Sequence, residues 1–175
     1  GRGGICHQVM LENGYARSGR LIIATDAHVT TYGGVGCLGL GVGVTDAAMA
    51  LNTGTMWIKV PEAIQINLTG SLQHASAKDL AIQILKDIPF SEFNYRIVEL
   101  TGQGVHSLSM DDRFCICNML SEGGVKSCLV DGDEKTAEYL EKHADSDWEI
   151  IHPDQDANYE FSHCYNLNEI VPMVS

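Results

Sequence analysis

The chain has 175 residues, 45% of them hydrophobic, which is enough to bury a sizeable core in one medium domain or two small ones. Its formal net charge is −12, from 23 acidic and 11 basic residues, and this argues against a nucleic-acid-binding surface because such surfaces need clustered Lys and Arg. No apolar run approaches the roughly 20 residues of a membrane span, and the first residues lack a signal-peptide pattern.

The first 60 residues combine short apolar runs with a high density of glycine. The continuous apolar run at 20–25 predicts a buried strand, and Gly54 is typical of a helix end. Pro61 follows a predicted strand, so we expect residues 1–60 to close one domain and residues 61–175 to form most of the next. The expected elements are a helix over 4–13, a strand over 20–25, a polar loop over 26–32, a tightly packed helix over 43–52 and a strand over 55–60.

The remaining residues alternate strand and helix patterns, which predicts an α/β fold. Leu80, Ile84 and Ile88 lie on one stripe of a predicted helix. Ser109 is a typical N-cap for the helix that follows it. We expect strands over 63–69, 95–100, 125–130 and 159–165, and helices over 77–88, 110–122 and 133–144.

Six cysteines are spread over the chain without a C-x-x-C motif. Cys115 and Cys117 form the only close pair, and their side chains would diverge on a helix. We therefore expect buried free thiols and no metal site. Free thiols indicate a reducing cytoplasm.

A glycine motif at Gly34, Gly36 and Gly39 matches the G-x-G-x-x-G pattern of dinucleotide-binding folds. In those folds the glycines follow a strand directly and open a helix. Here residues 26–33 separate the predicted strand from the motif, and the glycines continue beyond it. The pattern therefore favours close helix packing through small residues over nucleotide binding.

Two histidines and their acidic neighbours are the candidate functional residues. Asp26 and His28 lie in a loop after a predicted strand, a place where ligands and catalytic groups collect in α/β folds. His7 lies on a helical pattern among apolar neighbours, and Glu122 precedes two glycines. Taken singly, each of these residues also fits a structural role.

A series of short colinear motifs over residues 4–136 resembles the aconitase superfamily, and within it the large subunits of the isopropylmalate dehydratase, homoaconitase and dimethylmalate dehydratase type. The resemblance implies a partial set of aconitase-type α/β/α domains, hence a fragment of a longer chain. Its motifs are GICHQ at 4–8, EN at 12–13, TDAH at 25–28, TTYG at 30–33, LTG at 68–70, AKD at 77–79, VE at 98–99, SLSM at 107–110, CNM at 117–119 and DEKT at 133–136.

The resemblance implies roles for individual residues. It pairs His7 with Asp26 and His28 with Glu122 as catalytic residues, and it assigns substrate contacts to Asp26, Ala27 and His28. The family uses this region to hold substrate and the hydroxyl bound to the labile iron of a [4Fe-4S] cluster. Hydroxide is a poor leaving group that must be polarised or protonated, and a carboxylate beside an imidazole orients the ring and stabilises its charged form.

The chain departs from the family pattern in two ways. Ala27 stands where the family has a serine that contacts substrate, and losing one hydrogen bond to a charged group costs about 1.5–3 kcal/mol. The upstream D-H segment and the three downstream cluster cysteines of the family are also absent, so the cluster of the full-length parent would have its ligands elsewhere.

The expected function is therefore part of a hydro-lyase that isomerises a 2-hydroxy di- or tricarboxylic acid, such as isopropylmalate or homocitrate, by dehydration and rehydration. The resemblance implies a small dehydratase subunit or a C-terminal swivelling domain as partner, a small hydroxy acid as ligand, and neither nucleic acid nor membrane. This segment alone is expected to be inactive. The alternative is a non-catalytic homologue with a binding or regulatory role, which Ala27 and the length of the chain would fit.

Overall fold

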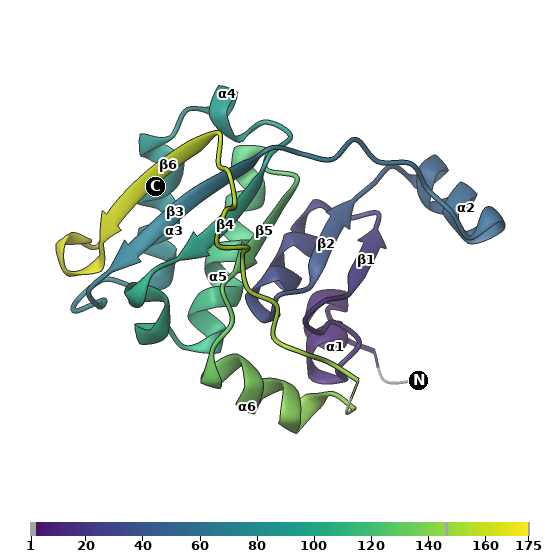
Figure 1. The fold of residues 1–175 in the computed structure, drawn as a ribbon, viewed down its shortest axis with the longest axis horizontal. Coiled ribbons are helices and arrows are strands. Elements are labelled where there is room, and N and C mark those ends of the chain that lie inside the picture. Colours follow the sequence, from purple (N-terminus) through teal and green to yellow (C-terminus); the bar gives the residue numbers. More distant parts are fainter. Residues whose placement is uncertain (1–2, 146, 175) are drawn as a thin grey trace.

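A computed structural model describes residues 3–145 and 147–174 and has an α/β fold built on two parallel sheets (Figure 1). The first part of the chain forms a small two-stranded sheet whose strands are connected by the 3₁₀ helix η1. The second part forms a larger sheet flanked by helices. The elements of the first part are α1 (Cys6–Glu12), β1 (Leu21–Ala24), η1 (Ala27–Val35), β2 (Leu38–Gly41) and α2 (Val44–Thr53).

The second part alternates strands with helices as its sequence predicts. Its helices begin at polar caps, and Ser109 forms the expected capping box with Asp112. The elements are β3 (Ala63–Thr69), α3 (Ala77–Asp87), α4 (Phe90–Phe93), β4 (Ile97–Thr101), η2 (Gln103–Ser107), α5 (Met110–Leu120), η3 (Ser121–Gly123), β5 (Ser127–Val130), α6 (Glu134–His143), β6 (Phe161–Asn166) and η4 (Leu167–Glu169).

The larger sheet has the strand order β5-β4-β3-β6, with all strands parallel. Alternate residues of β3 are buried, so that Ile64, Ile66 and Leu68 point into the main core. Helices α3 and α5 pack on each other and cover this face of the sheet. The core therefore lies between one sheet face and two helices.

The smaller sheet consists of β1 and β2, which are parallel and joined through η1. A second apolar cluster lies beneath η1 and includes Leu11 of α1, Tyr32 of η1 and Leu140 of α6. The two sheets are connected by a hydrogen bond of 2.8 Å from Ser127 Oγ to the carbonyl oxygen of Gly39. These contacts fix η1 against the main body of the protein.

Several expectations for the first 60 residues were wrong in detail. The polar loop expected over 26–32 is a 3₁₀ helix that is buried from Val29 to Val35. The strand β2 was not expected, because its glycines give no alternating pattern. No strand forms over 55–60, where the backbone has no strand partner.

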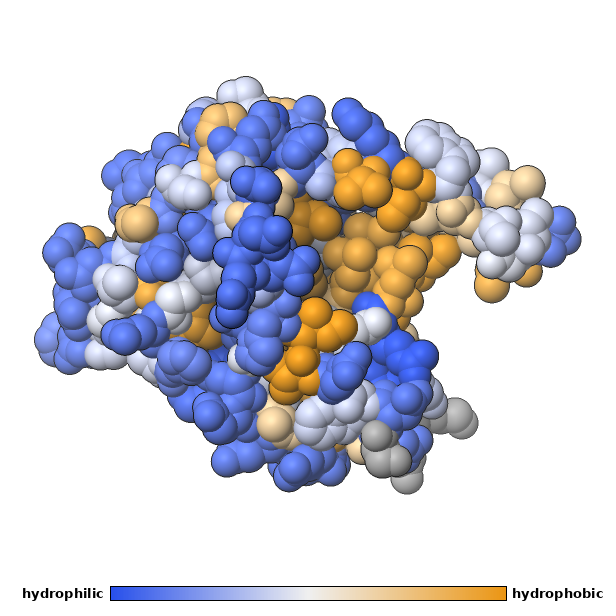
Figure 2. Space-filling view, viewed as in Figure 1, coloured by the Kyte–Doolittle hydropathy of each residue, from blue (hydrophilic) through white to orange (hydrophobic). Residues whose placement is uncertain are grey.

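The helix expected over 43–52 is present, and it ends at Gly54 in a left-handed conformation, but it is not tightly packed. It has no buried residue, and Leu51 is 89% exposed. This helix and the segment after it form an arm (residues 44–60) that projects from the body (Figure 1). Figure 2 shows apolar side chains over β1 and β2 and along the segment that leads to α2.

Within the described residues, no helix has the length and apolar character needed to cross a membrane. The division into domains at residue 60 stays a prediction. The cluster beneath η1 contains residues from both sides of that position, since Leu140 packs with Leu11 and Val29.

Candidate functional site

The four predicted catalytic residues meet where α1, η1 and η3 come together. His7 lies in the first turn of α1, and Asp26 is the N-cap of η1. His28 follows in the first turn of η1, while Glu122 comes from η3 at the end of α5. The fold thus brings together residues that are up to 115 positions apart in the sequence, from His7 to Glu122.

Asp26 is the centre of this cluster. Its Oδ1 accepts a hydrogen bond of 2.7 Å from the backbone N–H of His28 and lies 3.3 Å from Nδ1 of the same residue. The same oxygen lies 3.4 Å from Nε2 of His7, so the predicted contact of His7 with Asp26 is confirmed. The hydrogen bond from the His28 backbone, together with the two nearby histidines, holds the pKa of Asp26 below its ordinary value despite some desolvation.

His28 lies between two carboxylates. Its Nε2 is 3.0 Å from Oε1 of Glu122, which confirms the predicted contact across 94 residues of sequence. Its Nδ1 faces Asp26, a second contact that the paired assignment did not include. Only the protonated ring can donate to both carboxylates at once. The two contacts therefore fix the orientation of the His28 ring.

Tyr32 orients His7 and was missed as a site residue, although it lies in the TTYG motif. Its hydroxyl is 3.4 Å from Nδ1 of His7, and the two rings are 5.7 Å apart between centroids. Burial raises the pKa of Tyr32 to about 12, so the phenol keeps its proton and can donate to Nδ1. The other ring nitrogen of His7 is then free to carry the proton that faces Asp26.

Asn118 and Thr31 connect the two sides of the cluster. The Thr31 hydroxyl donates to the carbonyl oxygen of His28 at 2.6 Å and accepts a hydrogen bond of 2.9 Å from Nδ2 of Asn118. Asn118 lies on α5, one turn before Glu122. These two bonds tie the backbone at His28 to the helix that leads to Glu122. No periodic pattern signals this role, because it depends on how α5 approaches η1.

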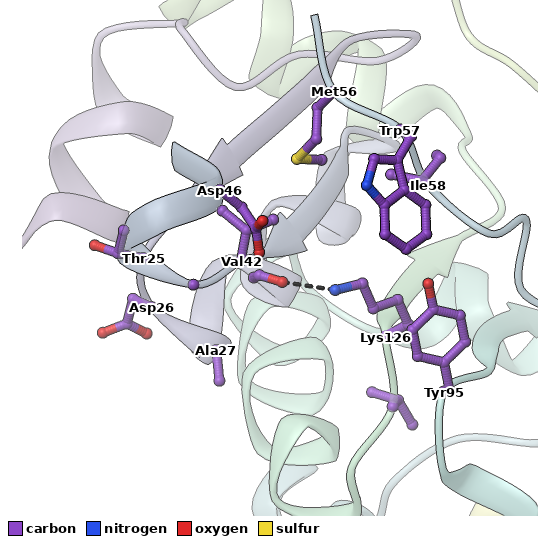
Figure 3. Close-up of a pocket in the computed structure, with 13 residues that line it drawn as sticks. Thr25, Asp26, Ala27, Val42, Asp46, Met56, Trp57, Ile58, Tyr95 and Lys126 are labelled. Carbon is purple, nitrogen blue, oxygen red and sulfur yellow. Dashed lines mark hydrogen bonds between the residues drawn. The ribbon is translucent and has the colours of Figure 1, made fainter. Parts of the chain in front are cut away.

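A pocket of about 430 Å³ opens beside the cluster (Figure 3). Asp26 and Ala27 lie on one side of it, and Trp57 of the arm lies on another. Among the described residues that line the pocket, Lys126 is the only basic one, and its Nζ donates to the carbonyl oxygen of Gly41 at 2.6 Å. The candidate site therefore combines a histidine–carboxylate cluster with a neighbouring cavity that can accept a small molecule.

The cysteines do not fit an iron–sulfur cluster. Cys37, Cys117 and Cys128 are buried as expected, whereas Cys6 and Cys164 are exposed, contrary to the expectation of buried thiols. Cluster ligation needs several thiolates that converge on one point. Among the described residues, the one group of three possible ligand side chains with donor atoms close together is His106, Asp133 and Glu134, which contains no cysteine.

Two of the buried thiols do lie together, with Sγ of Cys117 3.4 Å from Sγ of Cys128. Both side chains are fully buried in the main core. Burial raises the pKa of the Cys128 thiol. These two cysteines therefore act as core residues.

Comparison with protein-family models matches the aconitase family (aconitate hydratase) over residues 1–175. Curated relatives include "3-isopropylmalate dehydratase large subunit 1" of Methanopyrus kandleri, 37% identical over 99% of this chain and 42% of the relative. A "probable methanogen homoaconitase large subunit" of Methanosarcina mazei is 40% identical over 98% of the chain and 44% of its own length. The "2,3-dimethylmalate dehydratase large subunit" of Eubacterium barkeri is 40% identical over the whole chain and 42% of its own length.

Proposed function

Because the chain belongs to the aconitase family, we propose that it supplies part of the active site of a hydro-lyase that isomerises a 2-hydroxy di- or tricarboxylic acid. The chain spans 42–44% of the length of the three relatives described above, so the activity would belong to a longer parent protein. Their names refer to isopropylmalate, homoaconitate and dimethylmalate chemistry, and we propose an acid of this group as substrate.

The observation that carries this proposal is the position of His28 between Asp26 and Glu122. Dehydration requires a proton for the departing hydroxyl and a base for the proton of the adjacent carbon. A histidine held by carboxylates on both ring nitrogens has a fixed orientation and a defined route for its proton. We therefore propose that Glu122 holds Nε2 and orients the ring, and that His28 exchanges a proton with the reacting hydroxyl through Nδ1, whose contact with Asp26 is the longer one at 3.3 Å.

His7 would support this step from the other side of Asp26. It lies 3.4 Å from Asp26 and is oriented by Tyr32. Its ring centroid is 6.5 Å from that of His28, so the two imidazoles lie close together on neighbouring elements. We propose that His7 and Asp26 form the second proton-handling pair and that Asp26, Ala27 and His28 contact substrate.

The parent would need components that this chain does not contain. Membership in the aconitase family implies an iron–sulfur cluster, whose thiolate ligands would come from another part of the large subunit. The relatives are named large subunits, so we infer a small subunit or an equivalent swivelling domain as partner. The residues of this chain would supply orientation and proton transfer.

The proposal is tested with the full-length large subunit that contains this chain, expressed with its small subunit. We expect His28→Asn to lower kcat for 2-isopropylmalate or homocitrate by about 10²-fold or more, because a positioned acid–base group contributes on that order. The matched control is His163→Asn. His163 lies on β6, at the edge of the larger sheet opposite β5. Its Nε2 is 3.0 Å from Glu92, which does not belong to the candidate cluster. Equal activity of the His28 variant and the control would contradict the proposal.

A non-catalytic homologue is the second candidate, and the residue at position 27 favours it. Ala27 has no hydrogen-bonding side chain where the family has a serine that contacts substrate. If the parent is a degenerate enzyme, the wild-type protein loaded with its cluster will bind hydroxy acids without turnover. In that case Ala27→Ser is the substitution expected to restore activity, whereas an active wild-type enzyme would reject this candidate.

A further inference from the structure

Lys126 is a half-buried cation that faces the pocket beside the histidine cluster. Its ammonium donates to the carbonyl oxygen of Gly41 and lies 5.6 Å from the centroid of the Tyr95 ring (Figure 3). An ammonium has three donors. The carbonyl of Gly41 uses one of them, which leaves donor capacity directed toward the pocket.

No described carboxylate comes within 4.0 Å of the Lys126 ammonium, although Asp26 and Asp46 line the same pocket. Basic side chains withdrawn from solvent are usually paired with an acidic group, and the chain has 23 acidic residues. Here the acidic side chains lie elsewhere on the wall, and Lys126 is left to interact with a bound anion. A protein with a net charge of −12 needs such a local cation to attract an anionic substrate.

We infer that Lys126 binds a carboxylate group of the hydroxy-acid substrate in this pocket, an inference that rests on the function proposed above. Ala27 lies in the same lining and offers no side-chain donor. Lys126 therefore supplies a charged hydrogen-bond donor to a pocket in which position 27 supplies none. The ammonium would bind the carboxylate, and the reacting hydroxyl of the same substrate would point toward His28.

The rest of the lining favours an alkyl group beside that carboxylate. Met56, Trp57 and Ile58 of the arm form an apolar wall of the pocket (Figure 3). Asp26 and Asp46 add negative charge, which disfavours a second carboxylate in the same cavity, so the other carboxylate of a diacid would lie outside it. The best-suited substrate is thus a 2-hydroxy diacid with a branched alkyl group, and 2-isopropylmalate is the appropriate probe.

The first test is steady-state kinetics of the full-length enzyme with its small subunit. Lys126→Met removes the charge and keeps the length of the side chain, and it should raise KM for 2-isopropylmalate by about 10- to 100-fold, as expected for a lost hydrogen bond between charged groups. Its effect on kcat should be smaller. Lys126→Arg keeps the charge and should recover part of the loss in KM.

Lys135→Met is the matched control. Lys135 also donates to backbone carbonyl oxygens, those of His106 at 2.7 Å and Leu108 at 3.0 Å, but it does not line the pocket. The same chemical change at Lys135 should leave KM unaltered. An unchanged KM in the Lys126→Met enzyme, or an equal rise in the Lys135→Met enzyme, would overturn the inference while leaving the proposed hydro-lyase intact.

The second test needs no turnover and therefore separates the two proposals. The wild-type protein is acetylated with acetic anhydride with and without 2-isopropylmalate, and modification of each lysine is followed by peptide mass spectrometry. We expect 2-isopropylmalate to protect Lys126 and not Lys135. Absence of protection at Lys126 overturns the inference. Protection in a protein that shows no dehydratase activity would support carboxylate binding at Lys126 and count against the proposed reaction alone.

Discussion

The region around η1 and the arm (residues 44–60) are both rich in small residues, yet they pack in opposite ways. In the η1 region, a Cβ added at Gly33 would lie 1.6 Å from the carbonyl oxygen of Cys128, and one added at Gly39 would lie 2.0 Å from that of Val29. In the arm, a Cβ at Gly54 would meet nothing within 4 Å. Glycine thus allows backbones to touch in one region and only ends a helix in the other.

This difference explains where the candidate site is held rigidly. Because η1 lies directly on β5 and β2, the backbone that carries Asp26 and His28 is fixed by packing. The arm brings Trp57 to the pocket without being anchored in either apolar cluster. The position of the histidine cluster is therefore fixed by the packing of η1. The apolar wall that the arm adds to the pocket is not fixed by either apolar cluster.

The largest expected effect is a loss of stability that distinguishes a closely packed glycine, Gly33, from an exposed one, Gly54. Gly33→Ala should destabilise the chain by at least about 4 kcal/mol, because its methyl group would overlap a backbone carbonyl that cannot move away. Gly54→Ala should cost about 1 kcal/mol, the penalty for an alanine at a φ of 71°. Urea unfolding followed by far-ultraviolet circular dichroism measures both values. Equal losses would remove the distinction between the two regions.

The next largest effect concerns a buried ion pair that belongs to the packed body. Arg113 is fully buried and donates to both carboxylate oxygens of Asp133, at 2.8 and 2.6 Å. Asp133→Asn should destabilise the protein by about 3 kcal/mol at neutral pH, because it leaves a buried charge without its partner. The same unfolding experiment provides the value, and an effect below about 1 kcal/mol would contradict it.

The same residue predicts a pH dependence. Burial alone would raise the pKa of Asp133, but hydrogen bonds from Arg113 and His106 outweigh burial and hold the pKa well below its ordinary value. A lowered pKa stabilises the fold above the unfolded-state value of about 4, and this contribution is lost as the pH falls below it. The wild-type free energy of unfolding should therefore decline from about pH 4 downward, and the decline should be shallower in Asp133→Asn. Parallel curves would contradict this account.

Much of the site could be predicted from sequence because the residues lie in recognisable motifs. The contacts of His28 with Glu122 and of His7 with Asp26 were expected from such motifs and are present. The contact of His28 with Asp26 was not expected, since local backbone geometry at the start of η1 decides it. Tyr32 lies in the TTYG motif, but the motif alone does not assign it to the site. Its contact with His7 follows from tertiary packing.

The fold could be predicted best where side chains alternate or follow a helical period. Every expected element from β3 onward is present, and the short elements α4, η2 and η4 are additions. The glycines of β2 carry no side chains from which a strand could be recognised. The small residues of α2 show that the helix can pack closely, but they do not specify a partner, so its exposure could not be anticipated.

The central claim is that His28 and Glu122 act as one proton-handling unit. A double-mutant cycle in the full-length enzyme, with kcat/KM measured for wild type, His28→Asn, Glu122→Gln and the double variant, tests it most directly. If the two residues function through their 3.0 Å contact, the double variant should lose about as much activity as His28→Asn alone. Losses that multiply would show that the two side chains act independently, and they would contradict the account.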